Sequence, residues 1–128
     1  MFNSFRLERV YNKTLKISGT SNTDFLNDSV LENMNVTGLA VRINTGNSVG
    51  ENGNPLVTRD ELNDILLQIK KGSDIIAEFP LILVDSCECK IMEINIPCFR
   101  PEYVKLLNGG NFTTTKDVDI FFFYNYSD

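Results

Sequence analysis

The 128-residue chain contains no histidine. This absence excludes serine and cysteine nucleophiles activated by a histidine, and it removes the most common general base near neutral pH and a frequent zinc ligand. A phosphate-binding glycine loop is also missing, because no such loop precedes Lys71-Gly72-Ser73. The sequence therefore predicts a protein that is not an enzyme, with no catalytic residues, no cofactor and no metal.

The chain also has little that would bind nucleic acid or enter a membrane. Its net charge is −5 and its 12 basic residues are scattered, whereas binding to a phosphate backbone needs a clustered basic face. The longest apolar run, Phe79 to Val84, has the length of a core strand and falls far short of the roughly 20 residues that span a bilayer. Residues 1–17 lack the apolar stretch of a secretory signal. We expect no nucleic-acid partner and no transmembrane segment. The chain is expected to be made and kept in a reducing cytoplasm, or to be secreted only by assembly into something larger.

What the chain has in quantity is apolar and aromatic residues. The hydrophobic fraction is 42%, with nine Phe and four Tyr, which suits one compact β-rich core. The length fits a single domain over residues 1–128.

Alternation of apolar and polar residues predicts several strands. Two of them are 36–43, with a possible bulge at Gly38, and 89–96, which Pro97 is expected to end. Two short extended pieces, 5–11 and 15–17, are separated by a predicted turn at 12–13. Residues 18–35 are predicted to be turn-rich with at most a short helix, and residues 101–107 to form a short helix.

Residues 58–71 fit two structures. Thr58-Arg59-Asp60-Glu61 matches a capping box, with apolar residues following at helical spacing. The same residues alternate equally well as a strand, and the turn at 70–74 would then make a hairpin with residues 75–84. The sequence leaves both open.

Residues 44–55 form the most loop-like segment of the chain. They include three Gly, four Asn and a Pro, a composition that cannot pack a core and is expected on the surface.

The strand predicted at 117–126, after a polar turn at 111–116, is the strongest signal. Val118, Ile120, Phe122, Tyr124 and Tyr126 share one face, while Phe121 and Phe123 lie on the other. Aromatic residues on both faces need cover on both sides. With Arg and aromatic side chains enriched at interfaces, the candidate contact residues are Phe99, Arg100, Phe121, Phe123, Tyr124 and Tyr126.

Paired carboxylates are the remaining route to catalysis, as in a glycosidase. Asp117 with Asp119, and Asp85 with Glu88 or Glu93, have suitable spacing, but such pairs on a strand are expected to be solvated exterior positions. The cysteines Cys87, Cys89 and Cys98 are expected to be small buried or half-buried residues, because a fourth zinc ligand is lacking.

The fold class predicted from these features is all-β, mainly strands with one or two short helices, in an antiparallel β-sandwich of jelly-roll type. The chain resembles small jelly-roll virion proteins of the penton or minor capsid type from tailless icosahedral viruses. The resemblance lies in the layout of short strands, the Asn- and Gly-rich loop, the hairpin candidate 65–80 and the last strand, Val118-Asp-Ile-Phe-Phe-Phe-Tyr. The resemblance implies a structural virion protein, assembled in the host cytoplasm as a homo-oligomer or with other virion proteins. The alternative hypothesis is a β-sandwich module that binds carbohydrate, with Tyr103, Tyr124 or Tyr126 as stacking platforms, or that binds protein.

Overall fold

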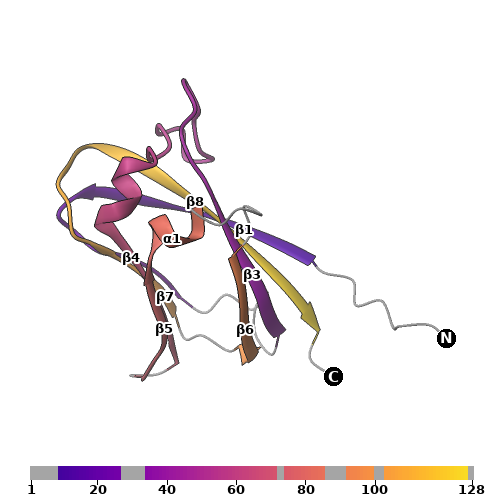
Figure 1. The fold of residues 1–128 in the computed structure, drawn as a ribbon. Coiled ribbons are helices and arrows are strands. Elements are labelled where there is room, and N and C mark those ends of the chain that lie inside the picture. The colour runs from indigo at the N-terminus through magenta and orange to yellow at the C-terminus, as the bar shows by residue number, and fades with distance from the viewer. Residues whose placement is uncertain (1–8, 27–33, 72–73, 86–91, 100–102, 127–128) are drawn as a thin grey trace.

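The computed structural model describes residues 9–26, 34–71, 74–85, 92–99 and 103–126, and most of these lie in strands (Figure 1). In chain order the elements are β1 (Arg9–Gly19), β2 (Thr23–Leu26), β3 (Met34–Arg42), the 3₁₀ helix η1 (Asp60–Asp64), β4 (Ile65–Lys71), β5 (Asp74–Pro80), α1 (Leu81–Asp85), β6 (Met92–Phe99), β7 (Tyr103–Asn108) and β8 (Phe112–Tyr126). They form sheet A, in the order β1-β8-β3-β6, and sheet B, in the order β2-β7-β4-β5. The prediction of an all-β fold with antiparallel sheets and short helices is confirmed.

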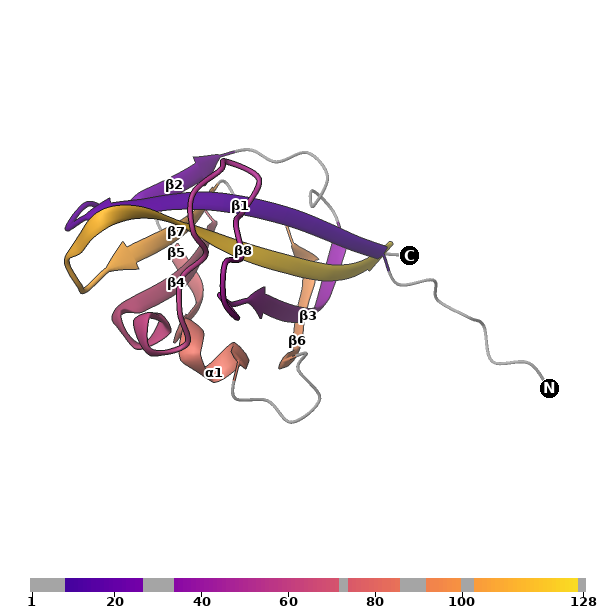
Figure 2. The same ribbon diagram turned by 90° about the horizontal axis from the view of Figure 1, so that it is seen from above.

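The strand pairs of the described residues are nested. β1 pairs with β8, β2 with β7, β3 with β6 and β4 with β5, all antiparallel. The further pairs β3–β8 and β4–β7 join these into two sheets. Each of the nested pairs joins a strand of the first half of the chain to one of the second half, except for the β4–β5 hairpin in the middle, and Figure 2 shows the two sheets from above.

The core lies between the facing sides of the two sheets. Strand β8 contributes every second residue, because side chains alternate between the faces of a strand, and its inward residues Val118, Ile120 and Phe122 are buried. The cluster also contains Leu15, Ile17, Val36, Leu39, Val57, Leu62, Ile65, Leu67, Ile69, Leu81, Val84, Leu106, Phe112 and Tyr124.

Residues 58–71 combine the two predicted structures. The backbone N–H of Thr58 donates to Glu61 Oε1 at 2.8 Å and the Glu61 N–H donates to Thr58 Oγ1 at 3.3 Å, which is the reciprocal pattern of a capping box. The helix ends after five residues, and from Ile65 the chain is a strand paired with both β5 and β7. Burial decides this: Ile65, Leu67 and Ile69 are fully buried at a period of two.

Several predicted boundaries in the first half of the chain are wrong. Residues 12–13 form no turn, because β1 continues through them, with Asn12 opposite Phe121 and Lys13 opposite Ile120. Residues 23–26 form strand β2 and not a turn or helix. The strand at 36–43 is confirmed as β3, and its register shifts between Val36 and Gly38 as the predicted bulge requires.

Other corrections concern proline and the second half of the chain. The apolar run 79–84 is not one strand: β5 ends at Pro80 and α1 begins at Leu81. Pro97 does not end β6, which continues to Phe99. Among the described residues β6 pairs only with β3, at the end of sheet A, and an edge strand tolerates the missing N–H.

The predicted helix at 101–107 is instead strand β7, and the predicted turn at 111–116 is the first part of β8. In both places the pairing partner decides the structure. β7 lies between β2 and β4, so its peptide groups have partners on both sides.

Candidate functional site

The outer face of sheet A carries a row of residues from three strands. The pairing register places Val10 beside Phe123, and Phe121 between Asn12 and Ala40. Further along β8, Asp119 lies between Thr14 and Arg42, and Asp117 lies beside Lys16. The row is therefore apolar toward the end of β8 and polar toward its middle.

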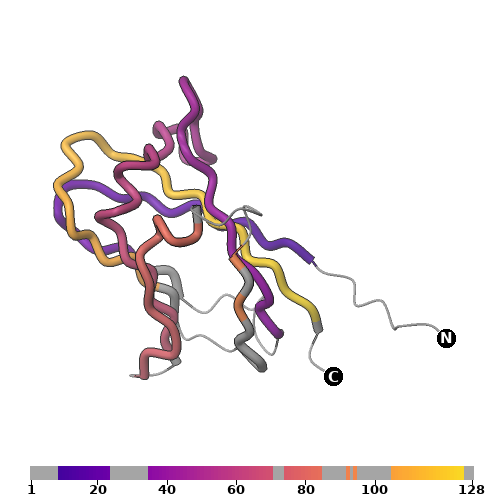
Figure 3. The backbone as a smooth tube through the Cα atoms, in the orientation of Figure 1, coloured from indigo at the N-terminus to yellow at the C-terminus, as the bar shows by residue number. Residues whose placement is uncertain are grey.

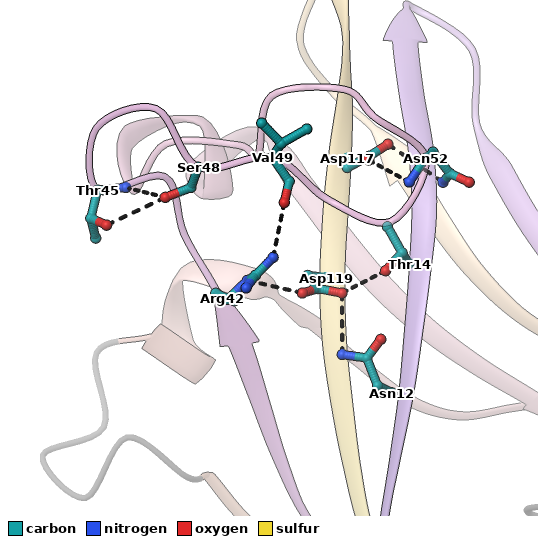
Figure 4. A network of polar contacts seen from close by, with 9 residues as sticks. All are labelled: Asn12, Thr14, Arg42, Thr45, Ser48, Val49, Asn52, Asp117 and Asp119. Carbon is teal, nitrogen blue, oxygen red and sulfur yellow. Dashed lines mark hydrogen bonds and ion pairs between the residues drawn. The ribbon is translucent and has the colours of Figure 1, made fainter.

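Asp119 accepts hydrogen bonds from both neighbouring strands (Figure 4). Its Oδ1 accepts from Thr14 Oγ1 at 2.6 Å and from Asn12 Nδ2 at 3.2 Å. Its Oδ2 lies 3.1 Å from Arg42 Nε. The carboxylate is almost fully buried while the Arg42 side chain is half-exposed, so the charge of Asp119 is compensated inside a network that ties β1, β8 and β3 together.

Asp117 is fully buried and holds the loop 44–55 against the sheet. Its Oδ2 accepts the backbone N–H groups of Asn52 at 3.2 Å and Asn54 at 3.3 Å. Its Oδ1 accepts the side-chain amides of Asn52 at 3.5 Å and Asn54 at 3.0 Å. Arg42 adds a second anchor, because its Nη2 donates to the carbonyl oxygen of Val49 at 3.1 Å.

The loop can reach Asp117 because β3 leaves the sheet just before that point. The last β3–β8 pair is Arg42 opposite Asp119. Beyond it, residues 55–57 take the vacated position: the Asp117 N–H donates to the Pro55 carbonyl at 2.9 Å, and the Val57 N–H donates to the Asp117 carbonyl at 3.1 Å. Figure 3 shows this long excursion of the chain between β3 and η1.

This geometry corrects the expectation that Asp117 and Asp119 are solvated exterior positions. They do lie on the outer face of the sheet, but the loop and the neighbouring side chains bury both. Every one of their four carboxylate oxygens accepts at least one contact within the protein. The arrangement organises structure, since a carboxylate so engaged is not presented to a substrate. Of the other predicted acidic pair, the side chains of Asp85, Glu88 and Glu93 lie outside the described residues.

The candidate contact residues are dispersed. Phe121 and Phe123 are half-buried on the outer face of sheet A. Tyr124 belongs to the core cluster, so its ring is not offered to a partner or a sugar. Phe99 and Tyr126 end β6 and β8, but their side chains, like those of Tyr103 and the three cysteines, are outside the described residues, as is Arg100 altogether.

Sequence reasoning missed the apolar side chains that are most exposed. Ile75 and Ile76 of β5 are 51% and 41% exposed, and Val10 of β1 is 54% exposed. Leu83 of α1 and Val49 of the loop are also exposed. The signal was present in the pair Ile75-Ile76: two adjacent apolar residues in a strand point to opposite faces, so both can be buried only if both faces are covered.

Within the described ranges, no helix is long and apolar enough to cross a membrane. Nor do those ranges hold a group of three or more His, Cys, Asp or Glu side chains that would bind a metal ion. No protein-family model, curated protein or solved structure matches this chain.

Proposed function

We propose that this protein is a non-enzymatic structural subunit that assembles with other copies of itself through its strand edges, as the jelly-roll proteins of virions do. The nested pairing β1–β8, β2–β7, β3–β6 and β4–β5 supports the jelly-roll part of the proposal. Jelly rolls serve as capsid proteins, lectins and cupins. The absence of histidine argues against a cupin metal centre, and the burial of Tyr124 weakens the sugar-stacking alternative.

The exposed isoleucines of β5 are the observation that carries the proposal. Among the described residues β5 pairs only with β4, so within these residues no strand pairs with its other edge. Edge strands are usually protected by charge, proline or short length, because an apolar edge recruits another strand. β5 carries the exposed acids Asp74 and Glu78 and ends at Pro80, but Ile75 and Ile76, between the two acids, are exposed as well.

We propose that β1 of a second copy of the chain pairs with the other edge of β5, because β1 lies on the opposite side of the molecule. β1 is the first strand of sheet A and β5 the last strand of sheet B. The short turn from β1 into β2, closed by the bond from Thr23 Oγ1 to the Lys16 carbonyl at 2.6 Å, puts β1 and β2 on the same side, away from β5.

The two edges also differ in charge. β1 carries Arg9, Lys13 and Lys16 and no acid, whereas β5 carries Asp74 and Glu78 and no base. The attraction is modest, because Lys71 lies opposite Asp74 and Gln68 donates to Glu78. Apolar contact between Val10 of one copy and Ile75 of the next therefore contributes most of the free energy of association. Because the contact is head-to-tail, it joins the copies into a closed ring or an open chain.

The experiment is a measurement of mass in solution by native mass spectrometry and analytical ultracentrifugation over a range of protein concentrations. We expect the wild-type chain to form oligomers, and Ile75→Lys to shift it to the monomer, because lysine blocks edge pairing. Val49→Lys is the matched control: Val49 is also 51% exposed but lies in the loop, so this variant should assemble like the wild type.

A mixing experiment distinguishes the head-to-tail contact from a two-fold contact. Val10→Lys and Ile75→Lys each spoil one edge, so each alone should be monomeric, while their mixture retains one intact pair of edges and should stop at a heterodimer. A wild-type chain that stays monomeric at high concentration overturns the proposal, and so does equal disruption by Val49→Lys.

A further inference from the structure

Two Asn-Gly dipeptides occur in the chain, Asn52-Gly53 and Asn108-Gly109. In this dipeptide the backbone nitrogen of glycine attacks the Asn side-chain carbonyl carbon, because glycine has no side chain to obstruct the approach. The C–N bond to the amide breaks and ammonia leaves, which closes a succinimide. Water then opens the ring to aspartate or isoaspartate. No oxidant, metal or enzyme is needed, so the folded structure alone decides which of the two sites reacts.

Asn52 is placed to react. The residue is exposed, and its amide nitrogen makes a long contact of 3.5 Å with Asp117 Oδ1. Gly53 has φ +83°, and a Cβ built there meets no atom within 4 Å, so no neighbouring segment packs against its Cα. One backbone hydrogen bond, from the Gly53 N–H to the Gly50 carbonyl at 3.0 Å, has to open first.

Asn108 is held away from reaction. Its amide nitrogen donates to the Gly19 carbonyl at 2.9 Å and to the Ser21 carbonyl at 3.2 Å. Its Oδ1 accepts from the Gly110 N–H at 2.9 Å, and the Gly109 N–H donates to the Asp64 carbonyl at 2.7 Å. Four contacts, three of them to distant segments of the chain, hold this dipeptide before the Gly109 nitrogen can attack.

The reaction at Asn52 changes the site beneath the loop. In the aspartate product the amide that donates to Asp117 becomes a carboxylate that faces another carboxylate, and Asp117 is fully buried. The two like charges repel each other, and because Asp117 is buried its charge cannot turn away into water. An isoaspartate also lengthens the backbone between the N–H groups of Asn52 and Asn54, which both donate to Asp117 Oδ2.

We propose that Asn52 is a site of spontaneous deamidation, and that its conversion releases the loop 44–55 from Asp117. The loop is then an ageing-sensitive part of the surface: a freshly made chain has it closed over β8, and a converted chain has it open. The inference is independent of the assembly proposed above, because it uses only contacts within one chain.

The first test follows the folded protein during storage in mildly alkaline buffer, with peptide mapping by mass spectrometry. We expect the peptide with Asn52 to gain aspartate and isoaspartate about tenfold or more faster than the peptide with Asn108, since several hydrogen bonds protect the latter. In urea the two sites should react at similar rates, because both are then plain Asn-Gly. Equal rates in the folded protein, or a faster Asn108, overturn the proposal.

The second test asks whether conversion opens the loop. Asn52→Asp should speed cleavage after Glu51 by a glutamate-specific protease by about tenfold. The reason is that the free energy needed to open the loop falls by the contribution of one hydrogen bond to a charged group. Asn47→Asp is the matched control, with the same added charge on an exposed residue of the same loop. If Asn47→Asp is cleaved as fast as Asn52→Asp, or if Asn52→Asp is cleaved no faster than the wild type, the link to Asp117 is wrong.

Discussion

Replacing Asp117 by alanine tests whether one buried carboxylate fixes the loop 44–55. The change removes the acceptor of four contacts, two from Asn52 and two from Asn54. A hydrogen bond to a charged group contributes about 1.5–3 kcal/mol. Asn52 is exposed, so its two donors regain water when the carboxylate is lost, whereas Asn54 is half-buried. We therefore count about two such bonds and expect a loss of about 3–6 kcal/mol in the free energy of unfolding.

The measurement is urea unfolding followed by circular dichroism, with the midpoint compared at an unchanged slope. Asp117→Asn keeps the shape and one acceptor, so it should cost less, about 1–2 kcal/mol. Asp74→Ala is the control, since Asp74 is exposed and its removal changes the net charge equally; a surface substitution of this kind stays within about 0.5 kcal/mol. If Asp117→Ala is as stable as Asp74→Ala, the carboxylate does not hold the loop, and the reasoning fails.

Three further stability predictions use the same unfolding assay. Phe122→Ala should cost about 3–5 kcal/mol, because the ring is fully buried and lies 6.3 Å from the ring of Tyr11. Phe121→Ala should cost clearly less because Phe121 is half-buried, and the reverse order would show that the faces of β8 are misplaced. Gly50→Ala should cost about 1–3 kcal/mol, since a Cβ there overlaps the Asp117 side chain. That cost should shrink in the Asp117→Ala background, and strict additivity would contradict the contact. Arg42→Gln should cost about 1 kcal/mol at low salt and less at high salt, because the side chain is half-exposed; a salt-independent loss would speak against the ion pair with Asp119.

The fold class was predictable because it depends on local pattern. Val118, Ile120 and Phe122 alternate with polar or outward residues, and a period of two has one structural meaning in a run of that length. The capping box at Thr58 and Glu61 was also predictable, since its bonds join residues three apart.

The candidate site was not predictable to the same degree. Asp117 and Asp119 looked like solvated positions because nothing in their own strand covers them. Asp117 is covered by Asn52 and Asn54, more than 60 residues away in the sequence, and Asp119 is contacted by side chains of β1 and β3. Strand β7 was mistaken for a helix for a related reason: its structure depends on ladders to β2 and β4, which no local window contains.

The sequence alone determined that the chain is strand-rich and has no histidine, because composition and alternation carry that information directly. The tertiary structure decided which carboxylates are buried, which Asn-Gly pair is exposed and which isoleucines lie at an edge. Each of these depends on which distant segment lies alongside, and strand pairing between distant segments is set by the packing of the whole core.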